Sequence, residues 1–153
     1  MNSEYMFRSR WHVGHTRESL WDSLEALLET DNPMPWWPSV QVTHYDGDDL
    51  ELRAASFLGY ALTFRLADLE SFRPERLTFT SKGDLRGTGE VTFVDLGARS
   101  AMDIDWRVAT DRPWMRRTAW LLRPLFVGGH HLIMRQGEKH LNEWLDAHDP
   151  TSS

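Results

Sequence analysis

The amino-acid sequence predicts an α+β fold, in which a curved antiparallel sheet of seven strands wraps around one long C-terminal helix. Three observations lead to this prediction. Residues 5–13 alternate apolar and polar, as in a strand with one wet side. Residues 39–110 contain six more short strand patterns separated by turn signals. Residues 113–147 are amphipathic at helical spacing, and they provide the element that covers one face of the sheet.

Two short helices are expected between the first and second strands. Thr16 has the character of an N-cap, and leucines follow it at helical spacing, at Leu20, Leu24, Leu27 and Leu28. The second helix is limited to about a turn, because three prolines interrupt "TDNPMPWWPSV". The remaining strands are joined by short turns at 46–49, 59, 73–75 and 97, and connections this short predict an antiparallel meander.

Length and composition restrict the class of protein. The 153 residues predict a single domain over 1–148 with a short disordered tail at 149–153. Eight tryptophans suggest a roomy interior or a ligand surface, and the net charge of −6 argues against nucleic-acid binding. The absence of cysteine excludes disulfides and cysteine-ligated metal sites. With neither a signal peptide nor an apolar run of membrane-spanning length, a cytoplasmic protein is expected.

Strand parity predicts which side chains face the helix. In the last strand, Met102, Ile104 and Trp106 share one face, while Asp103 and Asp105 share the other. The two aspartates are expected to lie in solvent and to pair with arginines of the same strand, Arg99 or Arg107. The same argument turns several residues of the earlier strands inward: Val42, His44, Tyr60, Leu62 and Phe64.

Three histidines lie in the long helix, and only His130 falls within its apolar stripe. That stripe contains Ile133, Met134, Gly137, Leu141, Trp144 and Leu145. His130 therefore points toward the sheet, and two interpretations remain open: a hydrogen-bonded core histidine, or a polar group in an apolar cavity that orients a ligand or exchanges a proton. Because the adjacent His131 diverges from it, the pair cannot hold one ion, and neither a metal nor a cofactor is expected.

Four segments resemble bacterial polyketide cyclase/dehydrase-like proteins of the START-related superfamily. His130, Met134, Gly137 and Leu141 match a pattern of that family's terminal helix, although Gly129 replaces an asparagine common in relatives. "SLWDSL", "PWWPSV" and "GDLRGTGEVTF" resemble its first helix, the start of its second strand and its sixth strand. The resemblance implies the helix-grip fold with a deep apolar cavity. Family members bind lipids, sterols, polyketides or plant hormones, and some cyclise or dehydrate polyketides.

Three functions follow as hypotheses. The first is binding of a small hydrophobic or aromatic ligand, such as a lipid or polyketide, between the sheet and the C-terminal helix. The second is a polyketide cyclase/dehydratase-type enzyme with His130 as its general base, which needs a second polar group within reach. The third is an interaction module with a filled core. The chain is expected to be a monomer or homodimer, and the candidate ligand-binding residues are Trp37, Val42, His44, Tyr60, Leu62, Phe64, Met102, Ile104, Trp106, His130 and Met134.

Residues 112–126 form a basic segment in an otherwise acidic chain. Arginines 112, 116 and 123 gather on one side of it and apolar side chains on the other. This pattern is typical of a solvated basic face above a buried apolar one. The alternatives are a gate over the cavity, or an interfacial helix that touches an anionic membrane transiently while a ligand is exchanged.

Overall fold

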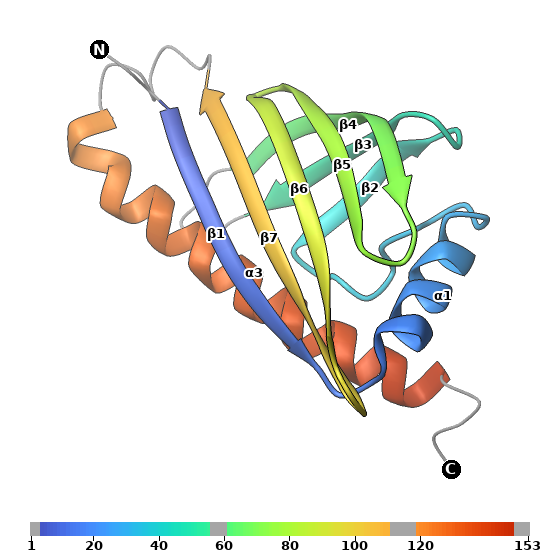
Figure 1. Ribbon diagram of the computed structural model, residues 1–153. Coiled ribbons are helices and arrows are strands. Elements are labelled where there is room, and N and C mark those ends of the chain that lie inside the picture. The colour runs from blue at the N-terminus through green and yellow to red at the C-terminus, as the bar shows by residue number, and fades with distance from the viewer. Residues whose placement is uncertain (1–3, 56–60, 111–118, 149–153) are drawn as a thin grey trace.

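Figure 1 presents a computed structural model of the protein, which describes residues 4–55, 61–110 and 119–148. Two helices and seven strands within these ranges confirm the predicted α+β class. The elements in chain order are β1 (Glu4–Val13), α1 (Arg17–Leu27), β2 (Val40–Tyr45), β3 (Leu50–Ala55), β4 (Ala61–Phe72), β5 (Arg76–Gly83), β6 (Leu85–Leu96), β7 (Arg99–Thr110) and α3 (Ala119–His148).

All seven strands belong to one antiparallel sheet with the order β1-β7-β6-β5-β4-β3-β2. Sequential strands pair directly from β2 to β7, which confirms the meander expected from the short turns. The sheet curls into a half-barrel, and α3 runs along it next to β1 (Figure 1). The core lies on the concave face of the sheet, between the strands, α1 and α3.

Helix α3 is held by polar groups at the β1 edge of the sheet and at the segment that precedes β2. At the β1 edge, Glu138 Oε2 accepts a hydrogen bond from the His12 amide at 2.7 Å, and Asn142 Nδ2 donates to the His12 carbonyl at 2.9 Å. Near the β2 edge, Trp37 Nε1 donates to the Ile133 carbonyl of the helix at 3.1 Å. Because an edge strand presents unpaired backbone groups, the two bonds at His12 both fix the helix and protect the β1 edge, while the Trp37 bond ties the helix to the segment before β2.

One helix, not two, separates β1 from β2. The predicted cap is present, since Thr16 Oγ1 accepts from the Ser19 amide at 3.1 Å, and α1 buries Leu20, Trp21 and Leu27. Residues 28–39 form turns, so the second short helix was a wrong prediction. The three prolines explain this, because each removes an amide donor and disfavours helical geometry in the residue before it.

The outward-facing aspartates of β7 lie where strand parity places them, but their partners come from another strand. Arg10 forms two hydrogen bonds to Asp103, at 2.6 and 2.8 Å, and Arg8 lies 3.6 Å from Asp105. Both arginines belong to β1, which pairs directly with β7 and sets each arginine opposite its aspartate. The Arg10 guanidinium holds the pKa of Asp103 below its usual value. Pairing with Arg99 or Arg107 was therefore a wrong prediction.

None of the helices within residues 4–55, 61–110 and 119–148 combines the length and the apolar character required to cross a bilayer.

Candidate functional site

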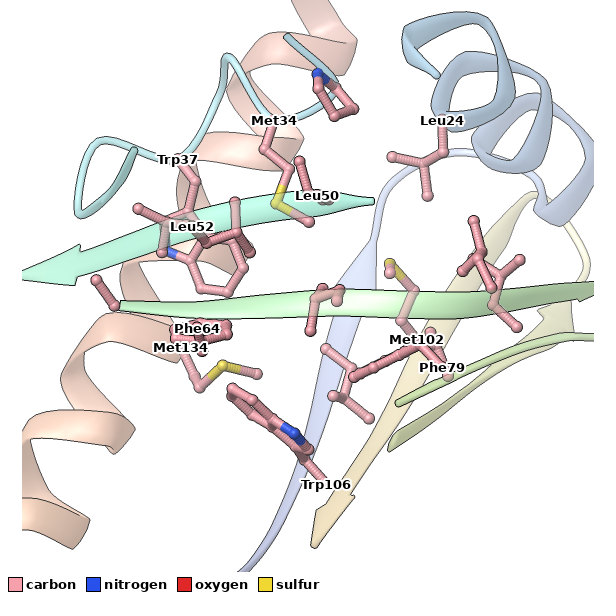
Figure 2. A pocket seen from close by; sticks show the side chains of 18 of the residues that line it. Leu24, Met34, Trp37, Leu50, Leu52, Phe64, Phe79, Met102, Trp106 and Met134 are labelled. Carbon is pink, nitrogen blue, oxygen red and sulfur yellow. The ribbon is translucent and has the colours of Figure 1, made fainter. Parts of the chain in front are cut away.

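A cavity of about 260 Å³ lies between the concave face of the sheet, α1, the 28–37 segment and α3. All seven strands contribute to its wall, which is almost entirely apolar. Figure 2 shows how side chains from distant parts of the chain converge on this space, from Leu24 of α1 to Trp106 of β7 and Met134 of α3. A concave, largely apolar hollow with a few polar groups is the usual form of a small-molecule site.

The structure brings eight of the eleven candidate ligand-binding residues to the cavity wall. They are Trp37, Leu62, Phe64, Met102, Ile104, Trp106, His130 and Met134. Val42 packs against the neighbouring core without lining the cavity. Tyr60 lies outside the described residues, as do the 149–153 tail and much of the basic 112–126 segment.

His44 is on the wrong side of the sheet, contrary to the prediction from parity. Its side chain is 59% exposed, and Nε2 lies 3.6 Å from a carboxylate oxygen of Asp46. The register of β2 against β3 shifts between Val42 and His44, so Thr43 is an extra residue in the strand. A bulge of this kind reverses the alternation of faces beyond it. Tyr45, predicted to face outward by simple alternation, therefore lines the cavity instead.

An aromatic row crosses the sheet beneath the cavity. Phe79, Gly89, Trp106 and Phe7 are successive cross-strand partners on β5, β6, β7 and β1. A Cβ atom on Gly89 would lie 2.1 Å from Cζ of Phe79, so only glycine lets that ring lie across β6. Trp106 then packs against Phe79 and Phe64, with ring centroids 6.4 and 5.3 Å away. The missing side chain at position 89 thus allows a continuous aromatic surface to form.

His130 of α3 packs against this aromatic row. Its ring stacks on Phe7, with centroids 3.7 Å apart, and lies 6.3 Å from the ring of Trp106. Its Nε2 is buried and has no hydrogen-bond partner among the described residues. Burial, with a smaller contribution from nearby His131, lowers the pKa of His130 from 6.5 to about 4. The imidazole is therefore neutral at pH 7, with one ring nitrogen left for a hydrogen bond.

A cluster of three tryptophans forms another part of the wall. Trp36 and Trp37 stack with centroids 5.3 Å apart, and Trp11 meets both of them edge-on. Trp37 bonds to the Ile133 carbonyl, whereas the indole nitrogens of Trp11 and Trp36 are buried without a partner among the described residues. Gly137 of α3 lies against this cluster, since a Cβ there would be 2.7 Å from atoms of Trp11 and Trp37.

The cavity reaches the surface between the end of α1 and the β2–β3 turn. Gly47, Asp48 and Leu69 line it there, and all three are exposed, Leu69 by 46%. Tyr45 crosses this mouth, because its hydroxyl donates to the Leu28 carbonyl at 2.6 Å. Burial, together with nearby carboxylates, raises the pKa of Tyr45. The gate that was an alternative interpretation of residues 112–126 falls largely outside the described residues.

Replacing Tyr45 with phenylalanine is expected to loosen this mouth. The change removes the hydrogen bond to Leu28 and should lower the free energy of unfolding by about 1 kcal/mol. An uncharged fluorescent ligand should also associate and dissociate faster in stopped-flow measurements, with little change in affinity. Thr63→Val removes an exposed hydroxyl from the outer face of β4 and serves as the control. Unchanged rates in Tyr45→Phe would show that ligands enter elsewhere.

Several residues of the cavity wall were not predicted from the sequence, although the sequence contains a signal for some of them. Phe7 shares the parity of Trp11 in β1, and both line the cavity. Phe79 has the same signal, since it alternates with Leu77 in β5 and both line the cavity, although the space for its ring depends on the glycine opposite it, at position 89. Tyr45 depends on the bulge in β2.

Other proteins of known structure share this fold. No family model matches the sequence, and no curated protein is similar to it at a significant level. A START superfamily protein from Mycobacterium smegmatis superposes with a TM-score of 0.64 and 14% identity, covering 93% of this chain and 97% of that one. The protein TTHA0849 from Thermus thermophilus gives 0.63 and 16%, covering 95% and 100%.

A third solved structure is that of an aromatase/cyclase. The Zhui aromatase/cyclase from Streptomyces sp. R1128 superposes with a TM-score of 0.66 and 11% identity, covering 98% of this chain and 99% of that one. Identities this low show a shared fold alone. The fold implied by the resemblance in sequence is confirmed: this chain has the helix-grip fold of START superfamily proteins and aromatase/cyclases.

Proposed function

We propose that the protein binds a small hydrophobic or aromatic ligand in the cavity between the sheet and α3, as a carrier or sensor. The observation that carries this proposal is the hollow itself, about 260 Å³ with an apolar wall. An apolar cavity of about 150 Å³ accommodates one benzene ring, so this one has room for about two fused rings. Removal of apolar surface from water, at roughly 25 cal/mol per Å², is the main driving force for such binding.

The hollow favours this proposal over an interaction module with a filled core. Protein interiors are close-packed, and a void of this size leaves its lining atoms without contacts. The cavity also reaches the surface, at the mouth beside Tyr45. An apolar cavity that a ligand can reach from the surface is stabilised when the ligand fills it.

The cyclase hypothesis receives less support from the same residues. A general base works best when its pKa lies near the working pH, and the pKa of His130 is about 4. Asp48 is the only carboxylate among the described lining residues, and it is exposed at the mouth. The sequence hypothesis required a second polar group within reach of His130. Among the described residues, Nε2 of His130 has no hydrogen-bond partner that could act as this second group.

Native mass spectrometry of gently purified protein, followed by organic extraction, tests the proposal directly. A discrete additional mass that is released by the extraction would identify the class of ligand. A bare protein mass, which persists after incubation with uncharged aromatic and lipid probes, would contradict the proposal and favour the interaction module.

Filling the cavity is expected to abolish binding. Leu66 lines the cavity, and Leu66→Trp should weaken binding of N-phenyl-1-naphthylamine, an uncharged fluorescent probe, by about tenfold or more. The neighbouring Arg65 points outward toward Asp49 and Glu51, so Arg65→Trp adds the same ring outside and should leave binding unchanged. Circular dichroism confirms that both variants fold. Equal binding by the two variants would place the probe outside this cavity.

Contact with a membrane during ligand exchange remains a second proposal, based on the basic 112–126 segment. It predicts that Arg116→Glu combined with Arg123→Glu releases the protein from anionic vesicles. Vesicle flotation measures this release. Equal flotation of both forms with anionic vesicles would leave the protein as a carrier or sensor that acts in solution.

A further inference from the structure

The charges around the cavity restrict the hydrophobic ligands that it accepts. Tyr45, Asp48 and His130 are the titratable groups among the described lining residues, and no lysine or arginine is included among them. Asp48 is acidic and lies at the mouth, and His130 is neutral at pH 7. A carboxylate drawn into this space would lose its hydration and find no opposite charge. The wall therefore disfavours anionic ligands, fatty acids included.

Four buried nitrogens on the cavity wall have no hydrogen-bond partner among the described residues. The pair of Trp106 and His130 is distinguished because it combines a donor with an acceptor, whereas Trp11 and Trp36 offer donors only. Trp106 Nε1 and His130 Nε2 are both buried without a hydrogen-bond partner among the described residues, and the two rings are 6.3 Å apart. An indole N–H can only donate a hydrogen bond, whereas an unprotonated imidazole nitrogen accepts one. A hydroxyl group does both at a single oxygen atom. One ligand hydroxyl between these rings would satisfy both nitrogens, which otherwise cost free energy.

The side chains around Trp106 and His130 are aromatic rings with flat faces. Phe7 stacks on His130, and Phe64 and Phe79 pack against Trp106. Figure 2 shows Phe64, Phe79 and Trp106 extending from three different strands toward the same space. Ring faces of this kind pack well against another ring, in offset-stacked or edge-on arrangements. The shape of the site therefore favours a rigid ring system over a flexible chain.

We propose that the cavity selects an uncharged ring compound that bears a hydroxyl group, whose oxygen accepts from Trp106 Nε1 and donates to His130 Nε2. This inference rests on the proposed function and adds the chemical class of the ligand. Trp106 and His130 determine specificity in this arrangement, and the rest of the wall supplies affinity.

Three probes with the same ring system separate these contributions: 2-naphthol, naphthalene and 2-naphthoate. Equilibrium dialysis of the full chain at neutral pH should give 2-naphthol an affinity about tenfold or more above that of naphthalene, as expected for two neutral hydrogen bonds. The ionised 2-naphthoate should bind at least tenfold more weakly than naphthalene. Binding of 2-naphthoate as tight as that of 2-naphthol would overturn the proposal.

Variants test whether Trp106 and His130 cause the preference for a ligand with a hydroxyl group. Trp106→Phe should lower the affinity for 2-naphthol by about threefold or more, because only the bond to His130 remains, and naphthalene binding should change by less than about twofold. His130→Phe should have the same effect, and it provides the test if the first variant fails to fold. Trp144 stacks on His148 and does not line the cavity, so Trp144→Phe should leave all three affinities unchanged.

The outcomes distinguish failure of this inference from failure of the proposed function. If naphthalene and 2-naphthol bind equally, and Trp106→Phe changes neither, the cavity binds ligands but the hydroxyl preference is wrong. If none of the three probes binds to the folded protein, both the preference and the ligand-binding function are wrong.

Discussion

Gly137→Ala is expected to lower the free energy of unfolding by about 1–2 kcal/mol, although alanine is the better helix former. The new Cβ would lie 2.7 Å from atoms of both Trp11 and Trp37, closer than real Cβ contacts. Both rings belong to one buried cluster with Trp36, and neither can move without displacing the others. Overpacking of this kind costs about 1–3 kcal/mol or more, which exceeds the gain in helix propensity of about 1 kcal/mol.

Gly128 provides a matched control on the same helix. It is exposed, and a Cβ there would meet nothing within 4 Å. Gly128→Ala should therefore raise the free energy of unfolding by about 0.5–1 kcal/mol. Urea unfolding followed by tryptophan fluorescence measures both variants, and it also reports on the cluster itself. Similar stability changes in the two variants would show that α3 does not approach the tryptophans closely.

The faces of the elements were predictable from the sequence because periodicity depends only on local geometry. Met102, Ile104 and Trp106 follow the two-residue period of β7, and all three line the cavity. His130 and Met134 follow the helical period of α3 and do the same. In these elements no irregularity interrupts the repeat, so each apolar set remains on one side.

Neighbours across the sheet were less predictable, since a period indicates a face but not a partner. Asp103 was placed on the outer face correctly, but its partner Arg10 lies 93 residues away on β1. The first strand, β1, pairs with the last strand, β7, and this pairing is a property of the whole fold. Side-chain pairs between strands depend on that register.

The prediction for His44 was wrong because of a local bulge that nothing in the nearby sequence marks. The bulge at Thr43 reverses the parity of one short strand, and neither glycine nor proline marks it in "VQVTHY". Thr43 Oγ1 donates to the side chain of Glu51 at 2.8 Å, a contact that exists only once β3 lies alongside. The irregularity is thus stabilised by tertiary structure, and strand-by-strand reasoning could not find it.

Lowering the pH from 7 to 4 is expected to cost the protein about 3 kcal/mol of stability through His130 alone. Burial lowers the pKa of this side chain from 6.5 to about 4. Between these two values an unfolded histidine binds a proton and the folded one does not. The unfolded state therefore takes up more protons, so stability is present at neutral pH and is lost as the pH falls through this window, at about 1.4 kcal/mol per pKa unit.

A difference measurement isolates this contribution from the other groups that titrate. His130→Phe keeps a ring of similar size stacked on Phe7 and removes the titrating nitrogen. Urea unfolding of both proteins at a series of pH values should show the wild type losing stability relative to the variant as the pH falls from 7 to 4, because only the wild type loses the contribution of His130. All other groups cancel in the difference if the two folds are the same. A difference that stays constant over this range would mean that water reaches His130, and the neutral imidazole on which the hydroxyl preference depends would then no longer be assured.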